Sequence, residues 1–221
     1  MEKSLIIGGS GGIGAALVAA FVARDAQVVS LSRSKGGLDI TDEASVEAHL
    51  GALEGPFDAL IVATGALVIE GAAPEKTVRA VSAQAMADQF AVNAIGPALI
   101  LRHAARLLPR AGRSVCAVLT ARVGSIGDNR VGGWTSYRAA KAAANQIVHT
   151  TAIELARTHP EMVCVALHPG TVETRFTQKY LGRHPAVPAA EAAQNLLAVM
   201  DGLGAKDTGG FFDWAGKPVP W

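Results

Sequence analysis

The sequence has few cysteines, few aromatic residues and little charge. Only two of its 221 residues are cysteines, 5% are aromatic and 18% are charged, with a formal net charge of +1. Cys116 and Cys164 each lie in an apolar run. We interpret both as buried, reduced thiols, because two such cysteines make neither a disulfide framework nor a metal site. A nearly neutral chain without a basic run argues against nucleic acid or an anionic membrane surface as the main partner.

Long hydrophobic runs are also missing, although half of the residues are hydrophobic. Gly, Arg or His interrupts each apolar stretch well before it reaches the length of a bilayer span. The first ten residues, MEKSLIIGGS, enter a strand-like run at once and show no signal-peptide pattern. Three histidines fall on predicted helices without metal-ligand spacing, namely His103, His149 and His159. We therefore expect a cytoplasmic globular protein with a sizeable core and no metal.

Strand-like and helix-like segments alternate along the chain. The patterns predict strands at 4–8, 26–32, 57–65, 113–120, 161–170 and 209–216. Helices are expected at 14–25, 41–53, 83–110 with a bend near Gly96 and Pro97, 135–158 and 189–200. Apolar strands that are separated by helices indicate a parallel sheet covered on both faces. We predict an α/β fold in which residues 1–221 form a single doubly wound domain.

Glycine is abundant, with 24 residues, and its placement after the first strand is informative. Gly8, Gly12 and Gly14 follow a G-x-x-x-G-x-G spacing between that strand and an apolar helix. Glycine there lets the backbone turn tightly, and a pyrophosphate then approaches the amides of the helix N-terminus. An ordinary glycine-rich turn fits the context less well. The loop therefore predicts a Rossmann-type dinucleotide site that includes Ser10 and Ile13.

The end of the second predicted strand indicates which dinucleotide is bound. Folds that prefer NAD usually place a carboxylate there to hold the ribose 2′-hydroxyl. This chain has Ser32 and Arg33 instead. A hydroxyl and a guanidinium suit a 2′-phosphate, so NADP(H) is predicted in preference to NAD(H). The alternative, that Arg33 is a solvated surface residue, stays open.

Tyr137 and Lys141 are four positions apart in an alanine-rich helical stretch, so their side chains share one helix face. Such a pair is either a surface contact of little energetic effect or a proton donor beside a cation that adjusts its pKa. The neighbouring motifs favour the second interpretation.

Together these motifs resemble the short-chain dehydrogenase/reductase family over nearly the whole length of the chain, and in particular its compact, C-factor-like and carbonyl reductase subgroup. The likeness rests on the glycine loop, on Asn93 in VNAIGP, on Y137-RAA-K141, on HPGTVET at 168–174 and on the closing GGFFDWAGKPVPW. It implies hydride transfer between NADP(H) and a small carbonyl or alcohol substrate. Tyr137 would be the acid or base, Lys141 would ease its ionisation and bond the nicotinamide ribose, and Asn93 would hold a relay water.

The resemblance also implies cofactor contacts further along the chain. Asp39 and Ile40 would contact the adenine, and the backbone at Ala63 and Gly65 would approach the cofactor. The segment that closes over the nicotinamide contains Pro169, Gly170, Val172 and Thr174, with Thr174 on the carboxamide.

Three departures from the family pattern qualify these expectations. Ala121 stands where the family usually has a serine, so the second donor to the substrate is expected from Ser125 first and Thr120 second. Too few residues separate Arg33 from Leu38 for the usual crossover helix, so we expect the third strand to be short or displaced. The run VATG at 62–65 replaces N-N-A-G, so its backbone groups need another hydrogen-bonding route.

The short segment after Thr174 implies a fairly open site. Phe176 and Tyr180 would line an apolar pocket or belong to a helix face, whereas Trp134 is expected to be a pocket wall. The leading hypothesis is an NADP(H)-dependent reductase or dehydrogenase. The alternative is an NADP(H)-binding sensor or C-factor-like signalling protein with little turnover. The resemblance also implies a homodimer or homotetramer that pairs through the helices at 83–110 and 135–158.

Overall fold

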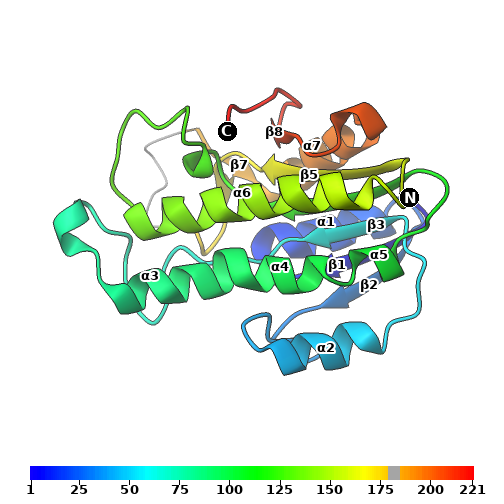
Figure 1. The fold of residues 1–221 in the computed structure, drawn as a ribbon, viewed down its shortest axis with the longest axis horizontal. Helices are drawn as coiled ribbons and strands as arrows, with labels where there is room; N and C mark the ends of the chain where they lie inside the picture. Colours follow the sequence, from blue (N-terminus) through cyan, green and yellow to red (C-terminus); the bar gives the residue numbers. More distant parts are fainter. Residues whose placement is uncertain (179–184) are drawn as a thin grey trace.

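The centre of the computed structural model, which describes residues 1–178 and 185–221, is a six-stranded parallel sheet (Figure 1). The strands lie in the order β2-β1-β3-β4-β5-β8. Their bounds are Lys3–Ile7 (β1), Gln27–Leu31 (β2), Ala59–Val62 (β3), Ser114–Leu119 (β4), Met162–His168 (β5) and Phe211–Asp213 (β8). Every residue of β3 and β4 is buried, as expected of apolar strands covered on both faces.

Helices cover both faces of this sheet. One face carries α2 (Glu43–Gly51), α3 (Ala83–Phe90), α4 (Gly96–Leu101), α5 (Ala104–Leu107) and α6 (Thr135–Leu155), and the other carries α1 (Gly12–Val22) and α7 (Ala189–Gly202). Figure 1 shows α3 and α4 running alongside α6 in front of the sheet. Alternate side chains of β1 join the two apolar cores: Leu5 and Ile7 pack on one side and Ile6 on the other. The predicted doubly wound α/β architecture is confirmed.

The topology places the candidate site at one edge of the sheet. Because all six strands are parallel, their carboxyl ends meet at the same edge, where Gly8, Ser32, Ala63, Thr120 and Pro169 follow them. The strand order reverses between β1 and β3, since β2 lies on one side of β1 and β3 on the other. Such a reversal opens a crevice that binds ligands in open α/β sheets.

The segment between β2 and α2 differs from its prediction. Residues 33–42 form no strand, whereas a short or displaced third strand was expected. The chain instead turns at Ser32, whose amide donates to the Lys35 carbonyl at 2.9 Å. Asp39 bonds to Thr41 rather than to a neighbouring strand. The helix also begins later than predicted, because the side chain of Asp42, not Thr41, caps it by accepting from the Ala44 amide.

The helix predicted over 83–110 is interrupted twice. A π-helical segment, Ala91–Ile95, separates α3 from α4 just before the expected bend at Gly96, and a turn separates α4 from α5. Glycine at 96 allows the loop before α2 to pack closely, because a Cβ there would lie 2.7 Å from the Ile40 side chain. No helix among residues 1–178 and 185–221 is long and apolar enough to cross a membrane. Both cysteines are buried and free, as predicted.

Candidate active site

The glycine loop after β1 forms a cradle that would accept a phosphate. Gly8 has a φ of +90°, a conformation that side chains other than glycine rarely adopt. Gly14 lies so close that a Cβ at this position would be 2.2 Å from the Gly8 carbonyl oxygen. Gly11 caps α1 without a side-chain hydrogen bond. The amides of the first turn of α1 are therefore available to an anion, which fits the pyrophosphate of a dinucleotide.

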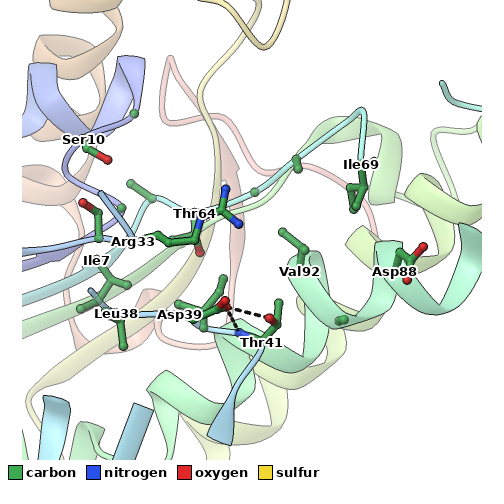
Figure 2. A pocket seen from close by; sticks show the side chains of 18 of the residues that line it. Ile7, Ser10, Arg33, Leu38, Asp39, Thr41, Thr64, Ile69, Asp88 and Val92 are labelled. Atoms are coloured by element: carbon green, nitrogen blue, oxygen red, sulfur yellow. Dashed lines mark hydrogen bonds between the residues drawn. The ribbon is translucent and has the colours of Figure 1, made fainter. Parts of the chain in front are cut away.

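A cavity of about 750 Å³ extends from this loop across the end of β2 (Figure 2). Its walls include Gly8, Ser10, Ser32, Asp39, Ile40, Ala63 and Gly65 from the predicted cofactor set. Arg33 is also part of the wall, and its side chain points into the cavity in Figure 2. The guanidinium of Arg33 is therefore in a position that suits the predicted 2′-phosphate.

Asp39 lies on the floor of the same cavity, but its carboxylate is already engaged. It accepts from the Thr41 hydroxyl at 2.7 Å and from the Thr41 amide at 2.9 Å. These two hydrogen bonds lower the pKa of Asp39, and the nearby charge of Arg33 adds to the effect. Asp39 is therefore an ionised carboxylate that shapes the loop. It lies in the loop between β2 and α2.

A second cavity, of about 610 Å³, joins the glycine loop to Tyr137 and Lys141. Both side chains come from the first turns of α6 and are almost fully buried, at 4% and 3% exposed. The Lys141 Nζ donates to the Leu119 carbonyl at 3.1 Å and lies 5.9 Å from the centroid of the Tyr137 ring. The sequence thus correctly placed the pair on one helix face.

The electrostatics of this pair differ from the expectation. Burial lowers the pKa of Lys141 to about 8, because the charged ammonium loses its hydration. Burial also raises the pKa of Tyr137 well above its ordinary value, because a phenolate in this position would lose its hydration. Tyr137 is therefore protonated at neutral pH, which suits a proton donor.

Two aromatic side chains flank the phenol. The Trp134 ring meets Tyr137 edge-on at 6.2 Å between centroids, and the Phe176 ring lies tilted at 6.3 Å. Trp134 is in the left-handed region, with a φ of 53°, immediately before α6. Phe176 lines the cavity, whereas Trp134 lies beside the phenol and its role as a pocket wall stays a prediction. Tyr180 lies outside the described residues.

Asn93 bonds to the backbone of Ala66, directly after the VATG run. Its buried side chain accepts from the Ala66 amide at 3.1 Å and donates to the Ala66 carbonyl at 2.9 Å. It also donates to Gln89 at 2.8 Å. A Cβ at Gly65 would lie 3.1 Å from the Asn93 Oδ1 and 3.2 Å from the Lys141 Nζ. Glycine at 65 thus brings the loop after β3 against both residues, and Asn93 holds that loop in place.

Ser125 and Thr120 are arranged in the opposite way to the predicted order. The Ser125 hydroxyl donates to the Pro220 carbonyl and accepts from the Asp128 amide at 3.0 Å, so it anchors the C-terminal segment. It does not line the cavity of Tyr137, whereas Thr120 does. The Thr120 hydroxyl is buried and has no hydrogen-bond partner in the described part of the chain. The geometry therefore favours Thr120 as the second donor.

The segment after β5 closes the cavity from the other side. Pro169, Gly170, Val172 and Thr174 all line it, as does Ile13 of the glycine loop. The methyl group of Thr174 abuts Gly12, where a Cβ would lie 2.5 Å from it. The short strand β6 (Val172–Glu173) pairs with β7 (Val187–Pro188) and holds this segment in position. The structure thus brings the predicted nicotinamide segment against the glycine loop.

The sequence did not single out two further residues near the site. Glu75 is 8% exposed, and its carboxylate accepts from the hydroxyl and amide of Ser136, which precedes Tyr137. It thus caps the first turn of α6 from a distant loop, and no local pattern distinguishes it from a surface acid. His168 lines the cavity, and burial lowers its pKa to about 4. Its position directly before Pro169 at a strand end was a signal that could have found it.

Comparison with known proteins agrees with this geometry. A family model described as short chain dehydrogenase matches residues 36–183. C-signal from Myxococcus xanthus is 38% identical over 140 residues, which cover 62% of this chain and 78% of the relative. The 1-hydroxy-2-glutathionyl-2-methyl-3-butene dehydrogenase of a Rhodococcus species is 31% identical over 188 residues, which cover 84% of this chain and 79% of the relative. The predicted likeness to C-factor-like proteins is confirmed.

A solved structure extends the comparison to three dimensions. A Burkholderia multivorans protein, described as a short-chain dehydrogenase/reductase with bound NADP, superposes with a TM-score of 0.83. The two proteins are 26% identical, and the match covers 99% of each chain. Sequence, fold and family model agree: the chain belongs to the short-chain dehydrogenase/reductase family of oxidoreductases.

Proposed function

We propose that this protein transfers hydride between NADP(H) and a small carbonyl or alcohol substrate. The observation that carries the proposal is a single cavity in which the buried Tyr137 and Lys141 face the glycine loop. A cofactor on that loop and a carbonyl group at Tyr137 would share this cavity. Loss of NADPH absorbance on addition of aldehydes, ketones or quinones tests the activity.

The cofactor would lie across both large cavities. Gly8, Ser10 and Gly12 would hold its pyrophosphate, and Ser32 with Arg33 its 2′-phosphate. Thr174 and the backbone at Gly170 would position the nicotinamide end. NADP(H) is favoured over NAD(H) because Arg33 points into the cavity and because the Burkholderia relative binds NADP.

When bound, NADPH supplies the hydride that adds to the carbonyl carbon. Tyr137 donates its phenolic proton to the carbonyl oxygen, so the products are an alcohol and a phenolate. The raised pKa of Tyr137 keeps this proton in place at neutral pH, so it is available for transfer to the carbonyl oxygen. The Lys141 ammonium stabilises the phenolate that results. Thr120 donates a second hydrogen bond to the substrate oxygen.

A second candidate function is supported by the match to C-signal. In that case the protein would bind NADP(H) and act chiefly as a sensor or signalling protein. Tight NADPH binding without turnover of any carbonyl compound would favour this alternative. The presence of Tyr137, Lys141 and Asn93 together favours the enzyme, because a binding module does not require all three.

We also infer a homodimer or homotetramer that pairs through α3, α4 and α6. Exposed apolar side chains lie on α6, where Ile153 is 53% exposed, and on the π-helical segment between α3 and α4, where Ile95 is 50% exposed. Pairing across a two-fold axis would bury them. Light scattering at micromolar concentration should give the mass of a dimer or tetramer, and the mass of one chain would contradict the inference.

A further inference from the structure

A third cavity, of about 370 Å³, opens beside the one that contains Tyr137. Its walls are Gly65, Ala66, Leu67, Val68, Arg175, Phe176 and Gln178. Gly65, Arg175 and Phe176 also line the cavity of Tyr137, so the two spaces are adjacent and share these walls. A volume of this size lies in the range of small-molecule sites. A substrate whose carbonyl group lies at Tyr137 therefore has room for a further group here.

The walls of this third cavity combine apolar surface with one charge. Leu67, Val68 and Phe176 are apolar, and Gln178 carries a neutral amide. Arg175 is the charged residue among the described lining residues. Phe176 lies against the Tyr137 ring, so the apolar surface continues directly from the phenol into this space. The chemistry suits a ligand with an apolar body and a negatively charged end.

The guanidinium of Arg175 is available to such a ligand. Within residues 1–178 and 185–221 it makes no hydrogen bond or ion pair. Two other surface arginines are paired, since Arg102 bonds to Glu43 and Glu47 and Arg122 bonds to Asp128 and Asp213, whereas the exposed Arg79 and Arg157 also make no side-chain bond within the described residues. Arginine binds a carboxylate with two parallel hydrogen bonds, which gives direction as well as charge.

We propose that Arg175 selects carbonyl substrates that carry an anionic group, in the simplest case a carboxylate joined to the carbonyl through an aromatic or aliphatic body. This inference rests on the proposed reductase function. Hydride adds to the carbonyl carbon, Tyr137 gives its proton to the oxygen, and the carboxylate is unchanged and stays paired with Arg175. The ring of Phe176 and the side chain of Val68 hold the apolar body between the two polar ends.

The pyrophosphate of the cofactor is a second possible source of the anion. Arg175 also lines the cavity that contains Ser10 and Gly12 of the glycine loop. The substrate is favoured because the third cavity contains Arg175 but no residue of that loop. The two sources predict different kinetics. If Arg175 binds the cofactor pyrophosphate, loss of the guanidinium would raise the KM for NADPH. If Arg175 binds the substrate, the same loss would raise the KM for the anionic substrate.

The test compares 4-formylbenzoate with its neutral methyl ester as substrates of the NADPH-loaded protein. We expect the ratio of kcat/KM for acid over ester to fall by about ten-fold or more in Arg175→Gln, with the ester rate and the KM for NADPH nearly unchanged. Arg157→Gln, which changes an exposed arginine after the far end of α6, serves as the control and should leave the ratio unchanged. Calorimetry with the NADP⁺-loaded protein measures binding of each compound without turnover.

Each outcome decides the proposal. An acid-to-ester ratio that is equal in wild type and Arg175→Gln overturns it, and so does a raised KM for NADPH with an unchanged ratio. If the wild type reduces neither aldehyde but binds the acid in an Arg175-dependent way, the anion subsite stands and the proposed reductase activity fails. If the protein neither reduces the acid nor binds it through Arg175, the anion subsite is wrong.

Discussion

The Nζ atom of Lys141 lies 5.9 Å from the centroid of the Tyr137 ring and donates to the carbonyl of Leu119 at 3.1 Å. The ammonium is thus held by the end of β4 while it faces the phenol from one helical turn away. Both groups have lost most of their hydration, since neither side chain is more than 4% exposed. Burial therefore disfavours the charged forms of both side chains, and folding stability should depend on pH as a result.

Lys141 should make folding stability rise with pH above about pH 8. Burial lowers its pKa from 10.5 to about 8. Below pH 8 both the folded and the unfolded chain carry the proton, so the full cost of a buried ammonium is present. Between pH 8 and 10.5 only the unfolded chain binds it, so stability rises with pH. Denaturant unfolding of wild type and Lys141→Met should show a difference in unfolding free energy that shifts in favour of wild type over this window.

Tyr137 is present in both proteins, so its own titration cancels from the comparison of wild type with Lys141→Met. Lys206→Met, at an exposed lysine, is the matched control and should show no such trend. A difference between wild type and Lys141→Met that stays constant with pH would mean that Lys141 titrates as an ordinary solvated amine.

Arg33 should determine the preference between the two dinucleotides. Arg33→Asp removes the guanidinium that points into the cavity and adds a carboxylate that would repel a 2′-phosphate. We expect the Kd for NADPH to rise by about ten-fold or more, with a far smaller change for NADH. Fluorescence titration measures both constants, and Arg79→Asp in the exposed 3₁₀ helix Val78–Ala80 is the control. An equal loss for both cofactors would exclude a 2′-phosphate role.

Thr120, rather than Ser125, should contribute to turnover. Thr120→Val keeps the shape of the side chain but removes the hydroxyl that lies at the substrate cavity. We expect kcat to fall about 10- to 100-fold, the cost of one lost hydrogen bond to the transition state. Ser125→Ala should lower thermal stability by loosening Pro220 and Asp128, with little change in kcat. The reverse pattern would restore Ser125 to the role suggested by the sequence.

Much of the fold was predictable because local patterns and tertiary packing agree. Apolar strands, the glycine loop and the alanine-rich helix at 135 each have one low-energy arrangement in a covered parallel sheet. The segment after Arg33 was harder to predict. Its length excluded a crossover helix, but the sequence pattern did not show which structure takes the place of that helix. The Ser32 turn and the bonds between Asp39 and Thr41 depend on how the loop folds onto Gly96.

The site contacts that follow from spacing along one helix were predictable from the sequence. Contacts between residues that are far apart in the sequence were not. Tyr137 and Lys141 are close because a helix makes them so. The engagement of Ser125 with Pro220 joins residues 95 positions apart, and that of Glu75 with Ser136 joins residues 61 positions apart. Hydrophobic periodicity in the sequence does not predict such contacts. The raised pKa of Tyr137 likewise depends on burial by the whole fold.

The most direct test of the proposed mechanism is the rate of NADPH oxidation by Tyr137→Phe at saturating cofactor and carbonyl substrate. Phenylalanine keeps the ring that packs between Trp134 and Phe176 but has no proton to give. The mechanism predicts a loss of about 100-fold or more in kcat, with an unchanged Kd for NADPH. Turnover equal to that of the wild type would contradict it.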